Sequence, residues 1–339
     1  MTARVTRHLA VAAVLVFGAA GCGGDGPAAR DGGDAHRLGV VIKGLDNPFF
    51  TAMRDGVESA ARDRMVDVRL RAATGLDDTA GQASNLEGLI AEDLDCYVVN
   101  PISQSNLLRA LSHVPDGTPV VNIDSPVAAD EAGALGIDIA TYIGTDNVAA
   151  GALAARTMAA LVDRGARVAV IGGTSGDATS AARIDGFRTG ARGRFAPLAP
   201  VPADWDEHTA LLAAGDLLRR DPRIQGFFAA NDQMALGVGR AVADAGRTGA
   251  VKVVGVDGIE RALEAVERGT MSATVSQYPY TMGRLGVEAC LAAASGASLP
   301  ARVDAPIHVV TRRNVMRAKA RFPEPVEPFE SPFAALLGG

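Results

Sequence analysis

From Arg37 onward, short apolar segments alternate with longer amphipathic ones, and this alternation constrains the fold more than any other feature of the sequence. Segments 38–42 and 96–100 are short and apolar, as buried strands are, whereas segment 49–64 has the spacing of an amphipathic helix. Strands that alternate with helices form parallel sheets covered by helices on both faces. The repeats are too numerous for one small sheet, so we expect an α/β fold with two doubly wound lobes.

The expected strands are 38–42, 67–72, 96–100, 119–123, 168–171, 198–202, 226–229, 251–255 and 273–276. The expected helices are 49–64, 79–92, 105–114 and those that begin at Ser180, Glu207, Asp232 and Ile259.

The composition excludes several classes of function. The 339 residues are 48% hydrophobic and 21% charged, which is ordinary for a globular protein and long enough for two domains. The net charge of -6 argues against a nucleic-acid partner. His113, His208 and His308 lie in no metal or nucleophile motif, and no Cys-x-x-Cys spacing occurs, so we expect no metal, no cofactor and no catalytic residue. Segment 172–177 is glycine-rich but lacks the end of a phosphate loop, and we interpret it as a turn.

The N-terminus is typical of an export signal followed by a linker. Arginines precede an apolar run over 9–17, and small residues then lead to Cys22. This pattern resembles a bacterial lipobox, which predicts cleavage of a signal peptide over 1–21 and acylation of Cys22; the alternative is a plain secretory signal. Segment 22–36 is rich in Gly, Asp and Pro and is expected to be a flexible tether.

Two further features of the mature chain left alternatives open. Segment 321–339 is rich in proline and acidic residues, so we expect it to be either disordered or a strap across the surface. Cys96 lies in an apolar strand segment and Cys290 in a helical pattern. We favour two buried free thiols, with a disulfide as the alternative in an oxidising compartment.

Polar side chains follow one expected strand after another. They include Lys43, Asn100, Asp124, Asn231 and Asp257. In open α/β sheets ligands bind at the carboxyl ends of the strands, so these side chains are candidates for one binding site. Amide and carboxylate groups can each hold two hydroxyls, which suits a sugar.

Six motifs in order carry a resemblance to a known family. They are 41–50 (VIKGLDNPFF), 121–124 (VNID), 144–147 (GTDN), 202–206 (PADWD), 230–237 (ANDQMALG) and 254–258 (VGVDG). Together they resemble the ribose-binding-protein group of periplasmic-binding-like folds, over roughly 37–312. The resemblance implies a type I periplasmic-binding-protein fold, with two Rossmann-like lobes joined by a three-segment hinge near Thr145, near Gln277 and near Ala305. The implied lobes are 37–145 plus 278–306, and 146–277 plus 307–320.

The resemblance also implies a set of sugar contacts. They are Lys43, Asn47, Phe49, Phe50, Asp124, Arg183, Trp205, Asn231, Asp257 and Gln277. Phe50 and Trp205 can sandwich the C–H faces of a sugar ring, and Arg183 and Asp124 can grip neighbouring hydroxyls. We interpret Asp232 as a helix N-cap rather than a ligand contact, and Asn147 as hinge support.

Two positions depart from ribose binders: Lys43 stands where they carry a small polar residue, and Ser125 where they carry an arginine. Lys43 and segment 202–206 are similar to allose-binding relatives. Lys43 and Arg183 balance Asp124 and Asp257 in formal charge, which favours a neutral monosaccharide or sugar alcohol.

The resemblance implies a monomeric, non-enzymatic binding protein. It would be exported, held on the extracytoplasmic face of the membrane through Cys22, and would close on its sugar and deliver it to the permease and ATPase of an ABC importer. The alternative is a binding protein that reports to a chemoreceptor or sensor kinase. A repressor of similar fold is disfavoured, because an export signal stands where a helix-turn-helix would be.

Overall fold

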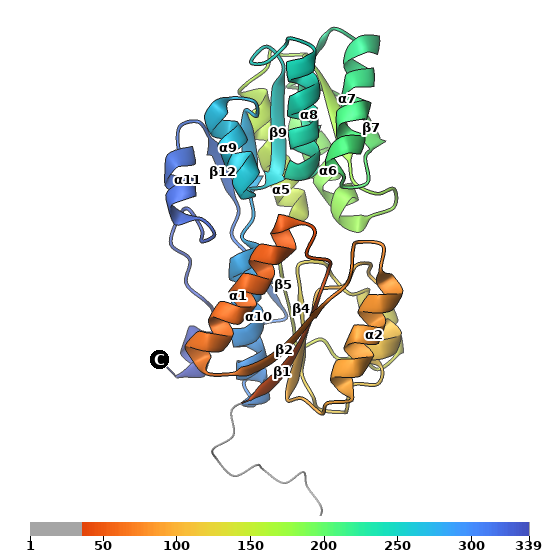
Figure 1. Ribbon diagram of the computed structural model, residues 1–339, viewed down its shortest axis with the longest axis vertical. Helices are drawn as coiled ribbons and strands as arrows, with labels where there is room; N and C mark the ends of the chain where they lie inside the picture. Colours follow the sequence, from red (N-terminus) through yellow and green to blue (C-terminus); the bar gives the residue numbers. More distant parts are fainter. Residues whose placement is uncertain (1–35, 339) are drawn as a thin grey trace, which may run out of the picture. The chain divides into compact units, whose positions relative to one another are not determined.

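The computed structural model describes residues 36–338, which form two α/β lobes (Figure 1). The predicted signal peptide over 1–21, the acylation of Cys22 and the tether up to residue 35 lie outside the described residues. Each lobe contains one six-stranded sheet, with the strand orders β11-β5-β4-β3-β1-β2 and β12-β10-β9-β8-β6-β7. The expected class, a two-lobed α/β fold, is therefore confirmed.

Neighbouring strands of the first sheet pair in parallel. Its strands are β1 (Arg37–Ile42), β2 (Asp67–Ala72), β3 (Cys96–Val99), β4 (Val120–Ile123), β5 (Thr141–Gly144) and β11 (Arg302–Asp304). Its helices are α1 (Pro48–Arg64), α2 (Thr79–Ile90), α3 (Leu108–Leu111), α4 (Ala129–Ala134), α10 (Pro279–Ala294) and the 3-10 helix η1 (Ala334–Leu337). The helix expected over 105–114 is thus reduced to the four residues of α3.

The second sheet is parallel except for β12, which runs antiparallel to β10. Its strands are β6 (Arg167–Gly172), β7 (Ala196–Pro202), β8 (Ile224–Ala229), β9 (Lys252–Asp257), β10 (Ala273–Ser276) and β12 (His308–Thr311). Its helices are α5 (Asn147–Ala159), α6 (Ala178–Ala191), α7 (Glu207–Arg220), α8 (Asp232–Asp244), α9 (Glu260–Arg268) and α11 (Val315–Arg321).

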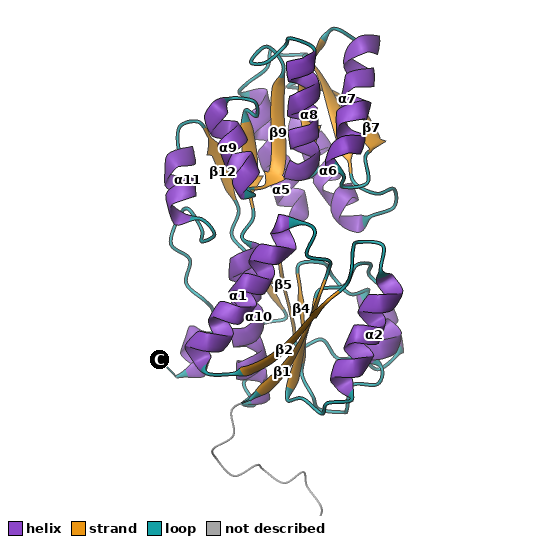
Figure 2. Cartoon of the chain, in the orientation of Figure 1, coloured by secondary structure: helices purple, strands orange, loops and turns teal. Residues whose placement is uncertain are grey.

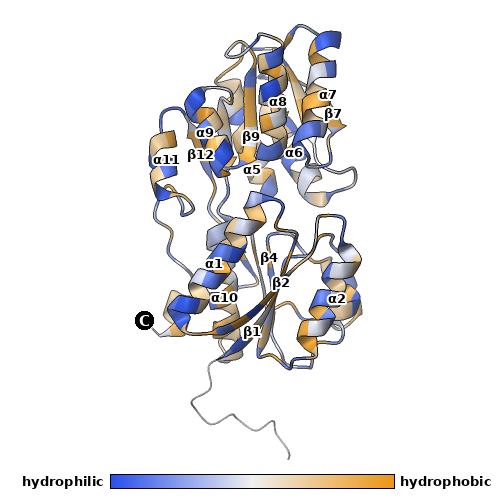
Figure 3. Ribbon diagram, in the orientation of Figure 1, coloured by the Kyte–Doolittle hydropathy of each residue, from blue (hydrophilic) through white to orange (hydrophobic). Residues whose placement is uncertain are grey.

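Successive side chains of a strand point to opposite faces of its sheet, and the inner strands are buried on both faces, whereas the edge strands β2 and β7 are partly exposed. On β6, Val168 and Val170 belong to one hydrophobic cluster, whereas Ala169 and Ile171 belong to another. The first sheet is likewise covered on both faces. Figure 2 shows helices lying against the strands of each lobe, and in Figure 3 strand β9 is coloured as hydrophobic. This is why the inner strands are continuous apolar runs rather than alternating ones.

The chain passes between the lobes three times. It leaves the first sheet after β5, returns between β10 and α10, and leaves again between β11 and β12. Where the chain returns to the first lobe, α10 packs closely against α1, and Gly56 of α1 and Gly283 of α10 make this approach possible. A Cβ at Gly56 would lie 2.0 Å from the carbonyl oxygen of Tyr280, and one at Gly283 would lie 2.2 Å from that of Met53. The second lobe is therefore inserted between two parts of the first that pack tightly together.

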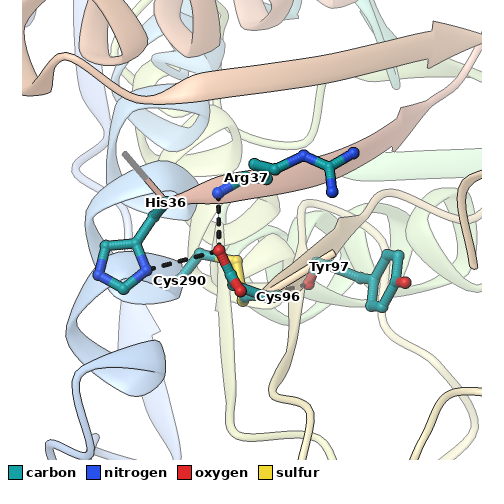
Figure 4. Close-up of a disulfide and its surroundings, with 6 residues drawn as sticks. His36, Arg37, Cys96, Tyr97 and Cys290 are labelled. Atoms are coloured by element: carbon teal, nitrogen blue, oxygen red, sulfur yellow. Dashed lines mark hydrogen bonds and ion pairs between the residues drawn. A yellow bond between two sulfur atoms is a disulfide. The ribbon is translucent and has the colours of Figure 1, made fainter. Parts of the chain in front are cut away.

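Cys96 of β3 and Cys290 of α10 form a disulfide (Figure 4), so the expectation of two free thiols was wrong. Both cysteines are fully buried, and their Cα atoms lie 5.7 Å apart. The two residues are 194 positions apart in sequence, and the return of the chain from the second lobe brings them together. Spacing in the sequence could not reveal this contact.

The C-terminal segment after α11 lies across both lobes. Val326 is buried in a hydrophobic cluster of the second lobe, and Phe333 is fully buried in a cluster of the first. The hydroxyl of Ser331 donates a hydrogen bond to Glu288 of α10 at 2.5 Å. The sequence left open whether this segment is disordered or a strap across the surface, and the structure shows a strap. Among the described residues, no helix combines the length and the apolar character needed to cross a membrane.

Candidate ligand-binding site

A cavity of about 320 Å³ lies where the strand ends of the two lobes meet. Its size is at the lower end of the range for small-molecule pockets. Nine of the ten predicted site residues line it: Lys43, Asn47, Phe49, Phe50, Asp124, Arg183, Trp205, Asn231 and Asp257. Gln277 lines a neighbouring cavity of about 450 Å³ instead, and its side-chain amide donates a 2.6 Å hydrogen bond to Asp257. The structure therefore places Gln277 behind the pocket carboxylate.

Both asparagines that line the pocket cap the N-terminus of a helix. The side chain of Asn47 accepts a hydrogen bond from the amide of Phe49 at 2.9 Å, and Pro48 occupies the first turn of α1. The side chain of Asn231 caps α8 in the same way, through the amide of Met234. The capping bond fixes each side chain at the edge of the pocket and leaves its amide nitrogen available to a ligand.

The interpretation of Asp232 as the cap of α8 was wrong, because its neighbour Asn231 has that role. Asp232 is fully buried, and its carboxylate accepts hydrogen bonds from the amides of Gly258 and Ile259 and from the hydroxyl of Thr274. It thereby holds the turn that follows Asp257.

The first lobe contributes a charged cluster formed by Lys43, Ser125 and Asp124. The ammonium of Lys43 donates a 2.6 Å hydrogen bond to the hydroxyl of Ser125 and lies 3.7 Å from the carboxylate of Asp124. Ser125 in turn donates to Asp124 at 3.2 Å. Lys43 also lies 5.3 Å from the ring centroid of Phe50, within the range of a cation–π contact. Ser125 thus keeps the Lys43 ammonium beside the pocket.

The second lobe contributes Arg183, which is 4% exposed and reaches the pocket from α6. Its Nε donates to the side-chain oxygen of Asn147 at 2.8 Å, and one terminal nitrogen donates to the carbonyl oxygen of Ala230 at 2.7 Å and to Asp257 at 3.3 Å. Asn147 therefore holds the guanidinium that the pocket uses, which is a more specific role than the hinge support expected of it.

Asp257 and Asp232 are two buried carboxyl groups that interact. Burial raises the pKa of Asp257 to about 6, against the opposing effect of Arg183. Burial also raises the pKa of Asp232, and the negative charge of Asp257 adds to this effect. The ion pair with Arg183 and the hydrogen bond from Gln277 favour the ionised form of Asp257. Asp257 is thus a carboxylate whose charge depends on its two partners.

Aromatic side chains come from both lobes. Phe49 and Phe50 contact each other edge to face, with ring centroids 5.3 Å apart. In the second lobe, the guanidinium carbon of Arg183 lies over the indole of Trp205, 5.8 Å from the ring centroid. The indole packs against Gly173. A Cβ at position 173 would come within 2.2 Å of the indole, so only glycine leaves room for the ring there. The pocket therefore has an aromatic wall in each lobe.

Three of the pocket residues have a left-handed backbone: Asp124 (φ 59°), Trp205 (φ 63°) and Asp257 (φ 134°). Such conformations are uncommon for residues other than glycine and cluster at functional sites, where the surrounding structure maintains them. Nothing in the sequence pattern signalled these conformations.

Sequence reasoning missed three loops that also line the cavity, of which the loop after β2 contributes Leu76. Ile102 and Ser103 follow β3, and the side chain of Gln82 fixes their loop by accepting from the amide of Ile102 and donating to the carbonyl oxygen of Asn100. The loop after β6 contributes Thr174, Ser175, Gly176 and Asp177, and Thr179 lines the cavity from the first turn of α6. All three loops follow strands, but the strand-end pattern selected only Asn100 after β3, and segment 172–177 was interpreted as a turn.

The loop after β6 changes the charge balance of the pocket. Asp177, which caps α6, brings a third carboxylate to a lining that contains the two cations Lys43 and Arg183. The lining therefore has more carboxylates than cations, which disfavours an anionic ligand further. Over residues 36–338 no group of three or more potential metal ligands was found. The pocket combines hydrogen-bonding groups of both kinds with two aromatic walls, and this combination fits a compact ligand with many hydroxyls.

Comparison with known proteins identifies the family. Residues 38–298 match the model of the periplasmic binding protein domain. The chain belongs to the periplasmic binding protein family. This binding protein is 36% identical over 263 residues to the D-allose-binding periplasmic protein of Escherichia coli, a match that covers 75% of this chain and 83% of that protein. It is 32% identical over 277 residues to the ribose import binding protein of Bacillus subtilis, covering 81% and 87% respectively.

A solved structure agrees with these relatives. The solute-binding protein of an ABC transporter from Actinobacillus succinogenes, with bound D-allose, superimposes with a TM-score of 0.78 at 28% identity; the match covers 83% of this binding protein and 99% of that chain. These relatives are substrate-binding proteins rather than enzymes, and the family is extracytoplasmic. The resemblance to the ribose- and allose-binding group is therefore confirmed.

Proposed function

We propose that this binding protein captures a neutral monosaccharide or sugar alcohol between its lobes and delivers it to an ABC importer. The observation that carries the proposal is the make-up of the pocket: opposite-charge pairs at Lys43–Asp124 and Arg183–Asp257, and aromatic walls at Phe50 and Trp205. A site with buried polar groups selects hydroxyl-bearing ligands, because an analogue that lacks a hydroxyl leaves a group unpaired. The names of the relatives make D-allose and D-ribose the first candidates.

Binding is proposed to close the lobes. A ligand that touches both lobes at once gains its full contacts only when they are together, so it favours the closed arrangement. Small-angle scattering should show a smaller radius of gyration when a bound sugar is saturating. Equal dimensions with and without a tightly bound sugar would contradict the closure step.

The test of the ligand class is a thermal-shift panel on residues 36–339 with pentoses, hexoses including D-allose and D-ribose, sugar alcohols and sugar phosphates. A ligand that binds the folded state raises the melting temperature, so one neutral sugar or polyol should stand out. Stabilisation by charged ligands alone would refute the neutral-sugar proposal. Isothermal titration of the best ligand should then give one site per chain.

Delivery to an importer is tested in cells. Deleting the gene should abolish high-affinity uptake of the identified sugar. Normal uptake with a lost response to the sugar would instead favour the role in signalling.

Anchoring through Cys22 is part of the proposal, on the strength of the lipobox-like sequence alone. A Cys22→Ser variant should move from the membrane fraction to the soluble extracytoplasmic fraction and lose incorporation of labelled fatty acid. An unchanged distribution would leave a plain secretory signal as the better interpretation.

A further inference from the structure

Tyr142 lies on β5, outside the lining of the pocket, and touches the main chain of a pocket residue. Its hydroxyl donates a 2.6 Å hydrogen bond to the carbonyl oxygen of Asp124. The amide of Asp124 donates to the carbonyl oxygen of Ile143, the next residue of the same strand, at 2.8 Å. Strand β5 therefore holds Asp124 from both sides, once through its backbone and once through a side chain.

Asp124 has a conformation that requires such support. Its φ of 59° is unfavourable for a residue with a side chain, and such conformations persist where neighbouring groups maintain them. The direction of the Asp124 carboxylate depends on this backbone conformation. That carboxylate lies 3.7 Å from the ammonium of Lys43 and accepts from Ser125, so its direction also affects the charged cluster of the first lobe.

The phenol is itself held in place. The guanidinium of Arg302, on β11, lies 5.0 Å from the ring centroid of Tyr142. A Cβ at Gly144 would come within 2.2 Å of the Tyr142 hydroxyl, so the glycine leaves the space that the hydroxyl occupies. Burial raises the pKa of Tyr142, and the charge of Asp124 raises it further, so the hydroxyl keeps its proton and remains a donor.

We propose that Tyr142 is a positioning residue for ligand binding, which fixes Asp124 in the left-handed conformation that presents its carboxylate to the pocket. This inference rests on the proposed function, because it assigns to Tyr142 the affinity that depends on Asp124. Tyr142 does not contact the ligand; it acts through the main chain of Asp124.

The test is Tyr142→Phe, which removes the donor and keeps the ring. Tyr97→Phe is the matched control: Tyr97 is a buried tyrosine of the same sheet, and its hydroxyl accepts a hydrogen bond from the amide of Leu94, outside the pocket. With D-allose as the probe in isothermal titration, Tyr142→Phe should weaken binding about tenfold, the loss expected for one hydrogen bond. Tyr97→Phe should stay within about twofold even if both variants lose similar melting temperature.

A double-mutant comparison separates positioning from a general loss of stability. In an Asp124→Ala background, titrated at higher D-allose concentrations, adding Tyr142→Phe should change binding by less than about twofold. An undiminished loss in that background, or unchanged binding in Tyr142→Phe alone, would overturn the inference.

A measurement without sugar keeps this inference distinct from the proposed function. In the ligand-free protein, the amide NMR resonances of Asp124 and Ser125 should move in Tyr142→Phe and stay in place in Tyr97→Phe. Unmoved resonances would overturn the positioning role even if sugars bind. Failure of every sugar in the panel would refute the proposed ligand and leave this result standing.

Discussion

The guanidinium of Arg183 lies 3.3 Å from the carboxylate of Asp257, and both side chains are buried at the wall of the pocket. Removing one member of a buried ion pair is costly, because the other charge is left without a partner. The first lobe repeats this arrangement with Lys43 and Asp124. Each lobe therefore carries one pair of opposite charges that neutralise each other, so neither pair needs a charge from the ligand.

Arg183→Ala should abolish most ligand binding and lower the free energy of unfolding by about 3 kcal/mol, because Asp257 stays buried without its cation. Isothermal titration and chemical denaturation measure the two effects. Arg188→Ala, on the same helix but half-exposed, is the control and should change stability by less than about 0.5 kcal/mol. Equal effects of the two substitutions would contradict the role given to Arg183.

The raised pKa of Asp257, about 6 against an ordinary 3.8, predicts a pH effect. A carboxyl group with a higher pKa in the folded chain holds its proton more tightly there. Its contribution to stability is complete below the ordinary pKa and is lost as the pH rises through about 6. The contribution lost between pH 4 and 7 should be on the order of 1–3 kcal/mol.

The measurement is the free energy of unfolding against pH, compared between the wild type and Asp257→Asn. The comparison is needed because Asp78, Asp206 and Asp221 have lowered pKa values and act in the opposite direction. The difference between the two proteins should move in favour of the variant as the pH rises. A constant difference would show that Asp257 has an ordinary pKa.

Gly173→Ala should weaken ligand binding about tenfold or more, because the new methyl group would displace the indole of Trp205 that forms one aromatic wall. Tryptophan fluorescence reports the displacement directly, since Trp205 is the single tryptophan of the chain. Gly133→Ala, on α4 with open space around it, is the control and should alter neither signal.

Lys43→Ser should change the order of preference among sugars more than it weakens all of them. The ammonium donates to Ser125 and pairs with Asp124, so its loss alters one corner of the pocket and leaves the second lobe intact. Dissociation constants for D-allose, D-ribose and one sugar alcohol provide the measurement. A uniform loss across the three would make Lys43 a general contact.

Cys96→Ala should lower stability by about 2–5 kcal/mol, as is usual for the loss of a native disulfide that closes a long loop. Thiol titration of the unfolded, unreduced mature protein should find no free thiol of Cys96 or Cys290. Two reactive thiols would contradict the disulfide. Wild-type protein treated with reductant should match the variant in its melting temperature.

The sequence was most informative about the strand ends. Lys43, Asp124 and Asn231 follow strands, and Asp257 ends one. Because the carboxyl ends of parallel strands lie at the same edge of a sheet, the sequence pattern could predict a shared site. Arg183 reaches the same pocket from within a helix. Strand order says nothing of such a residue, and only the family resemblance indicated it.

What could not be predicted depends on contacts between distant segments. The disulfide needs α10 to return from the second lobe, and the hydrogen bond from Tyr142 to Asp124 needs β4 and β5 to be neighbours in a known register. The left-handed conformation of Asp124 is accompanied by two hydrogen bonds to β5 that depend on that register. Gln277 was placed among the ligand contacts by the family resemblance, which did not indicate that its amide donates a hydrogen bond to Asp257.

The strap after α11 connects the two lobes through a segment of limited length. Its two seated residues, Val326 and Phe333, are seven positions apart, and an extended chain covers at most about 3.6 Å per residue, or about 25 Å in all. The two seats can separate no further than this while both remain occupied. Any wider opening of the lobes would have to release Val326 from the second lobe or Phe333 from the first, so the strap sets an upper limit to an opening that keeps both residues buried.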